Sequence, residues 1–114
     1  MTPNEYQNAA LRTAPKYPEE VGKIPQLING LMGLNGEAGE AIDILKKHLF
    51  HHHKLDKGHL AKELGDIAWY LAVTADALGY TLEDILKMNI DKLMARYPEG
   101  FDANRSQHRD PNDI

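Results

Sequence analysis

Residues 25–50 read PQLINGLMGLNGEAGEAIDILKKHLF, and their pattern decides the fold. Seven positions follow one another at alternating spacings of three and four, which is typical of one face of a helix. Further apolar residues widen this surface beyond one face, as in a helix central to a bundle or at a subunit interface. The stripe comprises Ile28, Leu31, Asn35, Ala38, Ile42, Leu45 and Leu49, and the additional residues are Leu27, Leu34, Ala41 and Ile44.

Helical signals also precede this segment. Thr2 and Glu5 have the spacing of a capping box, which predicts a short helix through about Thr13. Residues 14–25 contain three prolines and a glycine, so we expect a linker there.

Two more helices follow. The third begins near Asp56 and ends at Gly79, and the fourth begins after Thr81 and stops near Tyr97, because Pro98 follows. Residues 99–114 are polar and predict an extended or partly disordered arm. No strand-like alternation occurs. We therefore predict one all-α domain over residues 1–114, a helical bundle of three long helices with a short N-terminal helix and a polar C-terminal arm.

Composition narrows the class of protein. The chain has 114 residues and no cysteine, which excludes disulfides and thiolate metal sites. Its net charge of -4 argues against binding to nucleic-acid polymers. No apolar run approaches a membrane span, and the N-terminus lacks the pattern of a signal peptide, so we expect a cytoplasmic protein without a membrane partner.

Two acidic pairs stand out on the predicted second and third helices. Glu37 and Glu40 form one pair, and Glu63 and Asp66 form the other; residues three apart are neighbours on a helix surface. Four carboxylates at one place repel unless a cation holds them, and oxygen ligands suit Mg²⁺ or Mn²⁺. Because the first pair lies opposite the apolar stripe of its helix, it either faces solvent or faces a second packing partner.

Other polar and aromatic positions each have two interpretations. Asn89 interrupts an apolar row and either fixes helix register or binds substrate. Trp69 and Tyr70 are core aromatics or stack on a base. Four basic side chains either lie on the solvated helix surface or neutralise phosphates. These are Lys46, Lys47, Lys92 and Arg96.

A run of histidines follows the second helix. The run raises the hypothesis of a zinc site, but its ligands would come from a flexible connection without cysteine, so a helix-end cap is the better interpretation. The histidines are His48, His51, His52 and His53.

Several stretches of the chain form a familiar set. They are GLNGEAGE at 33–40, KKHLFH at 46–51, ELGDIAWYLA at 63–72 and NIDKLMARYPEGF at 89–101, with EYQ at 5–7 and Arg12-Thr13. Together they resemble the MazG-like family of all-α nucleoside triphosphate pyrophosphohydrolases. The first and third carry the family signature, E-x-x-E followed by E-x-x-D. The likeness covers roughly residues 3–109, and His52 stands where it leads us to expect a small residue, often glycine.

The resemblance implies a site and a reaction. Mg²⁺ would be held by Glu37, Glu40, Glu63 and Asp66, with Mn²⁺ as a possible substitute. Tyr70 and Asn89 would lie near the nucleotide, with Lys92 and Arg96 near its phosphates, and we add Trp69 and Lys47 as substrate contacts. The activity would be hydrolysis of a (deoxy)nucleoside triphosphate to the monophosphate and pyrophosphate, by a homodimer or homotetramer.

Alternatives remain open at this point. A relative in the same superfamily, phosphoribosyl-ATP pyrophosphohydrolase, would act on a different substrate. A non-enzymatic helical interaction module would bind metal or a partner without releasing pyrophosphate. A di-iron carboxylate bundle needs Glu-x-x-His pairs, and none occurs at the acidic clusters.

Overall fold

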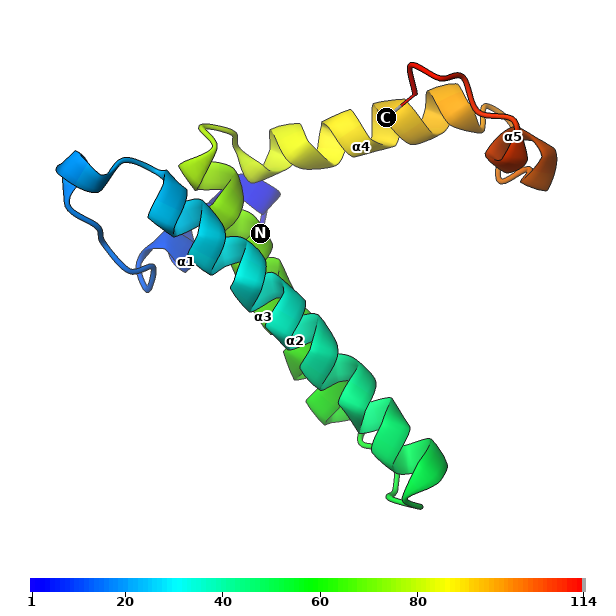
Figure 1. The fold of residues 1–114 in the computed structure, drawn as a ribbon, viewed down its shortest axis with the longest axis horizontal. Coiled ribbons are helices and arrows are strands. Elements are labelled where there is room, and N and C mark those ends of the chain that lie inside the picture. Colours follow the sequence, from blue (N-terminus) through cyan, green and yellow to red (C-terminus); the bar gives the residue numbers. More distant parts are fainter. Residues whose placement is uncertain (114) are drawn as a thin grey trace. The chain divides into compact units, whose positions relative to one another are not determined.

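The computed structural model describes residues 1–113, and within them the chain is helical, as predicted. The elements are α1 (Pro3–Leu11), the 3₁₀ turn η1 (Glu19–Val21), α2 (Ile24–Phe50), α3 (Lys57–Ala77), α4 (Leu82–Arg96) and α5 (Ala103–Gln107) (Figure 1). Contacts divide the chain into a first unit, Met1–Leu82, and a second unit that begins at Glu83. None of the helices in residues 1–113 has both the length and the apolarity that crossing a membrane requires.

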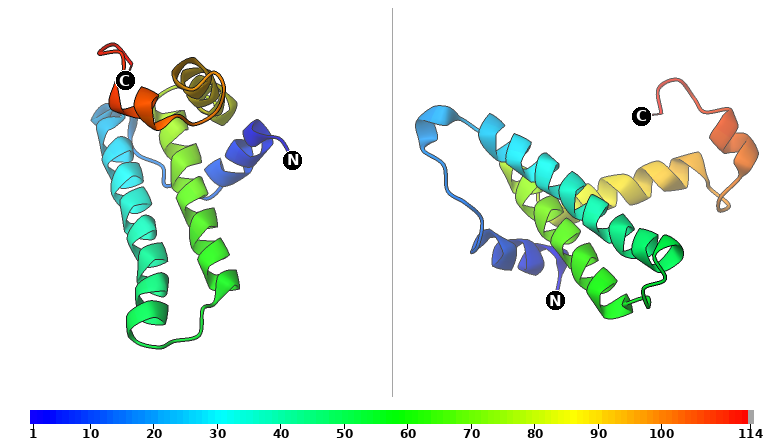
Figure 2. Two further views of the ribbon diagram at one scale, coloured as in Figure 1. Left: turned by 90° about the vertical axis from the view of Figure 1, so that its right-hand side faces the viewer. Right: turned by 60° about the horizontal axis from the view of Figure 1, so that its bottom comes forward.

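The first unit is built on an antiparallel pair of helices. α2 and α3 run side by side in opposite directions, joined by residues 51–56 (Figure 2). Two glycines of α2 allow the approach: a Cβ on Gly33 would lie 2.1 Å from Tyr70 Cε1, and one on Gly30 would lie 2.1 Å from Thr74 Oγ1. Side chains of α3 therefore fill notches in α2, which fixes the register of the pair.

A buried amide ties α1 to the C-terminal half of α3 and to the turn that follows it. Gln7 is only 5 % exposed. Its Nε2 donates to the carbonyl oxygens of Ala72 (3.1 Å) and Tyr80 (3.2 Å), and its Oε1 accepts from the backbone N–H of Leu82 (2.9 Å). One side chain thus satisfies three backbone groups around the turn that follows α3, where Gly79 adopts a φ of 83°.

The apolar stripe of α2 does not pack against α3. Ile28, Leu31, Ile42 and Leu49 are all more than half exposed in the single chain. The glycine-containing face packs on α3 instead, because only small residues permit so short a separation. The buried apolar core is correspondingly small. Ala10, Ala72 and Leu82 form one cluster with the half-buried residues Tyr6, Trp69, Leu71 and Val73 around it, and Ala75 is also buried.

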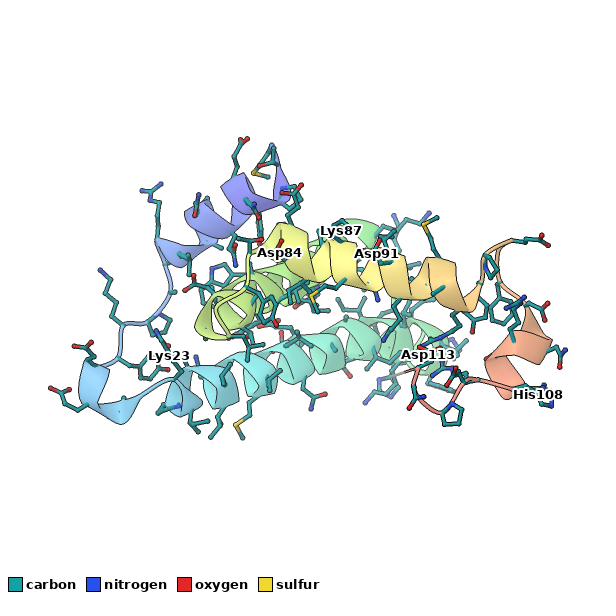
Figure 3. All side chains as sticks on the ribbon, turned by 90° about the horizontal axis from the view of Figure 1, so that it is seen from above. Lys23, Asp84, Lys87, Asp91, His108 and Asp113 are labelled. Carbon is teal, nitrogen blue, oxygen red and sulfur yellow. The ribbon has the colours of Figure 1, made fainter. Side chains whose placement is uncertain are left out.

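Residues 99–113 of the second unit differ from the extended or partly disordered arm that the sequence predicted. Asp102 accepts hydrogen bonds from the backbone of Asn104 and Arg105 and so caps the short helix α5. Arg96 then holds the chain end in a bidentate ion pair with Asp113, at 2.7 and 2.9 Å. Figure 3 shows Asp113 in this arm and, on α4, the Lys87 and Asp91 side chains one turn apart, which form an exposed ion pair. The polar arm is ordered by local caps and charges, which composition alone does not reveal.

Replacing Gln7 by Ala is expected to lower the free energy of unfolding by about 2–3 kcal/mol, because the N–H of Leu82 and the carbonyl of Tyr80 lose their buried partner. Urea denaturation followed by circular dichroism measures the change. Asn8→Ala, one exposed position further along α1, is the matched control and should be nearly neutral. Equal free energies of unfolding for the two variants would show that the hydrogen bonds of Gln7 do not stabilise the fold.

Candidate metal centre

Three carboxylates from the two paired helices converge on one point. Glu37 of α2 meets Glu63 and Asp66 of α3, and one oxygen from each lies within 4.8 Å of the other two. Within residues 1–113 this is the one group of three or more acidic, histidine or cysteine side chains close enough to share an ion. The antiparallel register set by the glycine notches brings these residues opposite one another.

The oxygens of this group include two that are buried and unpaired. Oε2 of Glu37 and Oε2 of Glu63 have no hydrogen-bond partner among the described residues. Glu63 is only 7 % exposed, whereas Glu37 is half-buried and Asp66 is exposed. Carboxylates only accept hydrogen bonds, so none of the three can satisfy another while all are ionised. A divalent cation bound by oxygen ligands fits this donor set and would satisfy both orphaned oxygens.

Charge crowding shifts the titration of Glu37. Its pKa lies above its ordinary value of 4.5, first because a proton there can be shared with the Glu63 carboxylate. Burial is the next cause, followed by the negative charges of Glu40, Asp66 and Glu63. The folded protein without metal therefore holds a proton on Glu37 more tightly than the unfolded chain does.

Glu40 is separate from the converging group. It is exposed, one turn further along α2, and lines a cavity of about 890 Å³ together with Glu63. This volume is within the range of small-molecule sites. The cavity also has cationic and histidine side chains on its wall, and Lys47 forms an ion pair with Asp43 at 2.9 Å. Its remaining lining residues are Gly36, Gly39, Ile44, His53, Lys54, Asp56 and His59.

The two aromatic candidates are engaged within the first unit. The Trp69 indole N–H donates to the Ala10 carbonyl (3.2 Å) and to Thr13 Oγ1 (3.0 Å), which fastens α3 to the end of α1. Tyr70 covers the notch at Gly33 and meets Trp69 edge to face. Both residues therefore have structural roles, and their contact with a nucleotide stays a prediction.

The remaining predicted substrate contacts lie in the second unit. Asn89 is exposed on α4. Lys92 and Arg96 line a separate cavity of about 390 Å³ at the C-terminal arm, where the Arg96 guanidinium is occupied by Asp113. Their roles at phosphates stay predictions.

The histidine run closes the end of α2. His48 Nδ1 lies 2.7 Å from the carbonyl oxygen of His53, a contact typical of a helix-end cap. His52 adopts a φ of 58°, in the left-handed region that favours glycine, which agrees with the small residue expected there.

Sequence reasoning missed a further histidine. His59 Nε2 lies 3.0 Å from Glu63 Oε1, four residues along α3. The i, i+4 spacing of the pair was visible in the sequence as a signal of contact on a helix.

Comparison with known proteins agrees with this architecture. Residues 27–101 match the model of the MazG nucleotide pyrophosphohydrolase domain. The gene 37 protein of Mycobacterium phage L5 is 37 % identical over 110 residues, which span 91 % of this chain and 96 % of that protein. No solved structure matches the chain significantly. The chain belongs to the MazG nucleotide pyrophosphohydrolase family, and the matched region includes all three converging carboxylates.

Removing the Glu37 charge is expected to stabilise the metal-free protein at pH 7. Because the folded-state pKa is raised, the unaltered chain is most stable when Glu37 is protonated, and this contribution is lost as pH rises through the folded-state pKa. The Glu37→Gln variant should therefore have the higher melting temperature at pH 7 in EDTA, and the difference should shrink toward pH 4. A lower melting temperature for Glu37→Gln than for the unaltered chain at pH 7 would show that the negative charges around Glu37 do not destabilise the metal-free fold.

Proposed function

We propose that this protein catalyses the Mg²⁺-dependent hydrolysis of a nucleoside triphosphate to the monophosphate and pyrophosphate. The observation that carries the proposal is the convergence of Glu37, Glu63 and Asp66, with two buried oxygens left unpaired. Family membership supports the reaction class, because the matched domain is one of nucleotide pyrophosphohydrolases.

The carboxylates have distinct tasks in this proposal. Glu37, Glu63 and Asp66 hold Mg²⁺, which when bound supplies a positive charge for phosphate oxygens and for the charge that develops in the transition state. Glu40 is the fourth acid of the signature and stands outside the group of three. We assign it to accept a hydrogen bond from the attacking water and to take its proton.

The cavity beside the carboxylates provides the space for the triphosphate. Lys47 and Lys54 line it and offer ammonium groups to the phosphate oxygens. Water adds its oxygen to the α-phosphorus, and the bond between that phosphorus and the oxygen bridging to the β-phosphate breaks. Pyrophosphate leaves with that oxygen, and the proton taken by Glu40 passes to solvent.

The Glu63→Gln variant is expected to lose at least about two orders of magnitude in turnover while remaining folded, because the neutral amide is a poor ligand for Mg²⁺. Release of pyrophosphate is measured in a coupled assay, with circular dichroism to verify the fold. Asp76→Asn, an exposed acid on the same helix, is the matched control and should retain full turnover. Undiminished turnover in folded Glu63→Gln would remove Glu63 from the mechanism.

A substrate panel tests the reaction itself. Each common and modified nucleoside triphosphate, and phosphoribosyl-ATP, is incubated with the purified protein and Mg²⁺, and pyrophosphate is measured. The proposal predicts release from at least one free nucleoside triphosphate. Release from phosphoribosyl-ATP alone would assign the histidine-pathway activity, and silence from a folded protein across the panel would favour an interaction module.

We further propose that a second copy of this chain covers the exposed face of α2. Apolar side chains on one helix face are costly to leave in water, and Ile42, Leu45 and Leu49 line an apolar groove of about 550 Å³ there. A like face on another copy is complementary by symmetry.

Ile42→Glu is expected to reduce the assembly to monomers, because burying the added charge against apolar side chains is unfavourable. Light scattering coupled to size-exclusion chromatography measures the mass, which for the unaltered protein should equal two or four chains. Asn8→Asp adds the same charge at an exposed site on α1 and should leave the assembly intact. A monomeric unaltered protein at high micromolar concentration would refute the proposed interface.

A further inference from the structure

His59 is positioned by the cap of its own helix. It lies in the first turn of α3, where its backbone N–H donates to Asp56 Oδ1 at 2.9 Å. One turn later its ring reaches Glu63: Nε2 lies 3.0 Å from Oε1, and because a carboxylate only accepts, Nε2 carries the hydrogen. The His59 side chain is 57 % exposed, whereas that of Glu63 is 9 % exposed.

This contact gives the two Glu63 carboxylate oxygens different surroundings. Oε1 is held by His59, whereas Oε2 is buried and has no hydrogen-bond partner among the described residues. The terminal torsion of a glutamate is broad and nearly two-fold, so a free carboxylate would sample many orientations. A hydrogen bond at one oxygen narrows that range. With Oε1 held by His59, Oε2 is the Glu63 oxygen left without a partner, on a side chain that has an oxygen within 4.8 Å of Glu37 and Asp66.

We propose that His59 is a positioning residue for the metal centre: it orients Glu63 so that its free oxygen binds the ion. The inference rests on the proposed function for the identity of the centre, but it assigns a role to a residue outside the four-acid signature. Hydrogen-bonding partners that orient metal ligands are typically worth 10- to 100-fold in metal affinity. His59 also lies on the wall of the cavity assigned to the triphosphate, but the role proposed for it runs through Glu63.

No other histidine near the site makes an equivalent contact in residues 1–113. His48 contacts the carbonyl of His53 within the helix-end cap, and the His51 ring lies 6.3 Å from the His53 ring, centroid to centroid. His51 also lies outside the lining of the cavity. It is therefore a matched control from the same region of the chain.

Mn²⁺ binding to the full chain without nucleotide tests the proposal directly. Isothermal titration or electron paramagnetic resonance gives the dissociation constant at one fixed pH. His59→Ala is expected to raise this constant about 10- to 100-fold. The His59→Gln variant keeps an N–H donor that can reach Glu63 and should stay within a few-fold of the unaltered chain, as should His51→Ala. Circular dichroism verifies that each variant is folded.

A second readout separates positioning from substrate contact. In the pyrophosphate assay, His59→Ala should need more Mg²⁺ for half-maximal rate, but its KM for nucleotide at saturating Mg²⁺ should be unchanged. A raised KM with unchanged Mn²⁺ affinity would place His59 at the substrate and overturn the proposal. Equal Mn²⁺ affinity of His59→Ala and the unaltered chain would also overturn it, leaving the proposed function in place. Failure of the unaltered chain to bind Mn²⁺ would overturn both.

Discussion

The close approach of α2 and α3 is the constraint on which the site depends. Gly30 and Gly33 leave notches that Thr74 and Tyr70 fill, and the residues one and two turns further along then face one another. Glu37 meets Glu63 and Asp66 because of this register. A larger side chain at either glycine would force the helices apart and separate the carboxylates, so close packing at the notches determines the electrostatics of the site one turn away.

The cluster of Glu37, Glu63 and Asp66 lowers the stability of the metal-free fold. Two oxygens are buried without partners and the pKa of Glu37 is raised, so the metal-free fold holds like charges together at a cost in stability. A bound cation would offset this cost, because it would neutralise the carboxylates and bind the unpaired oxygens. The cavity next to the group has ammonium side chains and a fourth acid on its wall, which suits a polyphosphate bound through metal. Family membership indicates the class of reaction, and the local geometry fits the metal dependence that we propose for it.

Helical periodicity predicted the all-α fold and the bounds of the long helices closely, because caps and prolines mark their ends locally. It did not predict which face of α2 packs on α3. The regular apolar stripe that includes Leu31 and Ile42 is exposed in the single chain, whereas the less apolar face that carries the glycines packs on α3. Helix α5 depends on the Asp102 cap in a polar segment. The acid spacing predicted that all four signature acids converge, and the structure brings Glu37, Glu63 and Asp66 together. It could not show that Glu40 stands apart, or that His59 holds Glu63, because these depend on side-chain directions across the helix pair.

Anomalous diffraction from crystals grown with Mn²⁺ tests the central claim most directly, because it locates the ion independently of any assay. The account predicts one or more peaks between α2 and α3, with oxygens of Glu37, Glu63 and Asp66 at coordination distance. Ordered carboxylates that point apart into solvent, with no peak between the helices at saturating Mn²⁺, would contradict it.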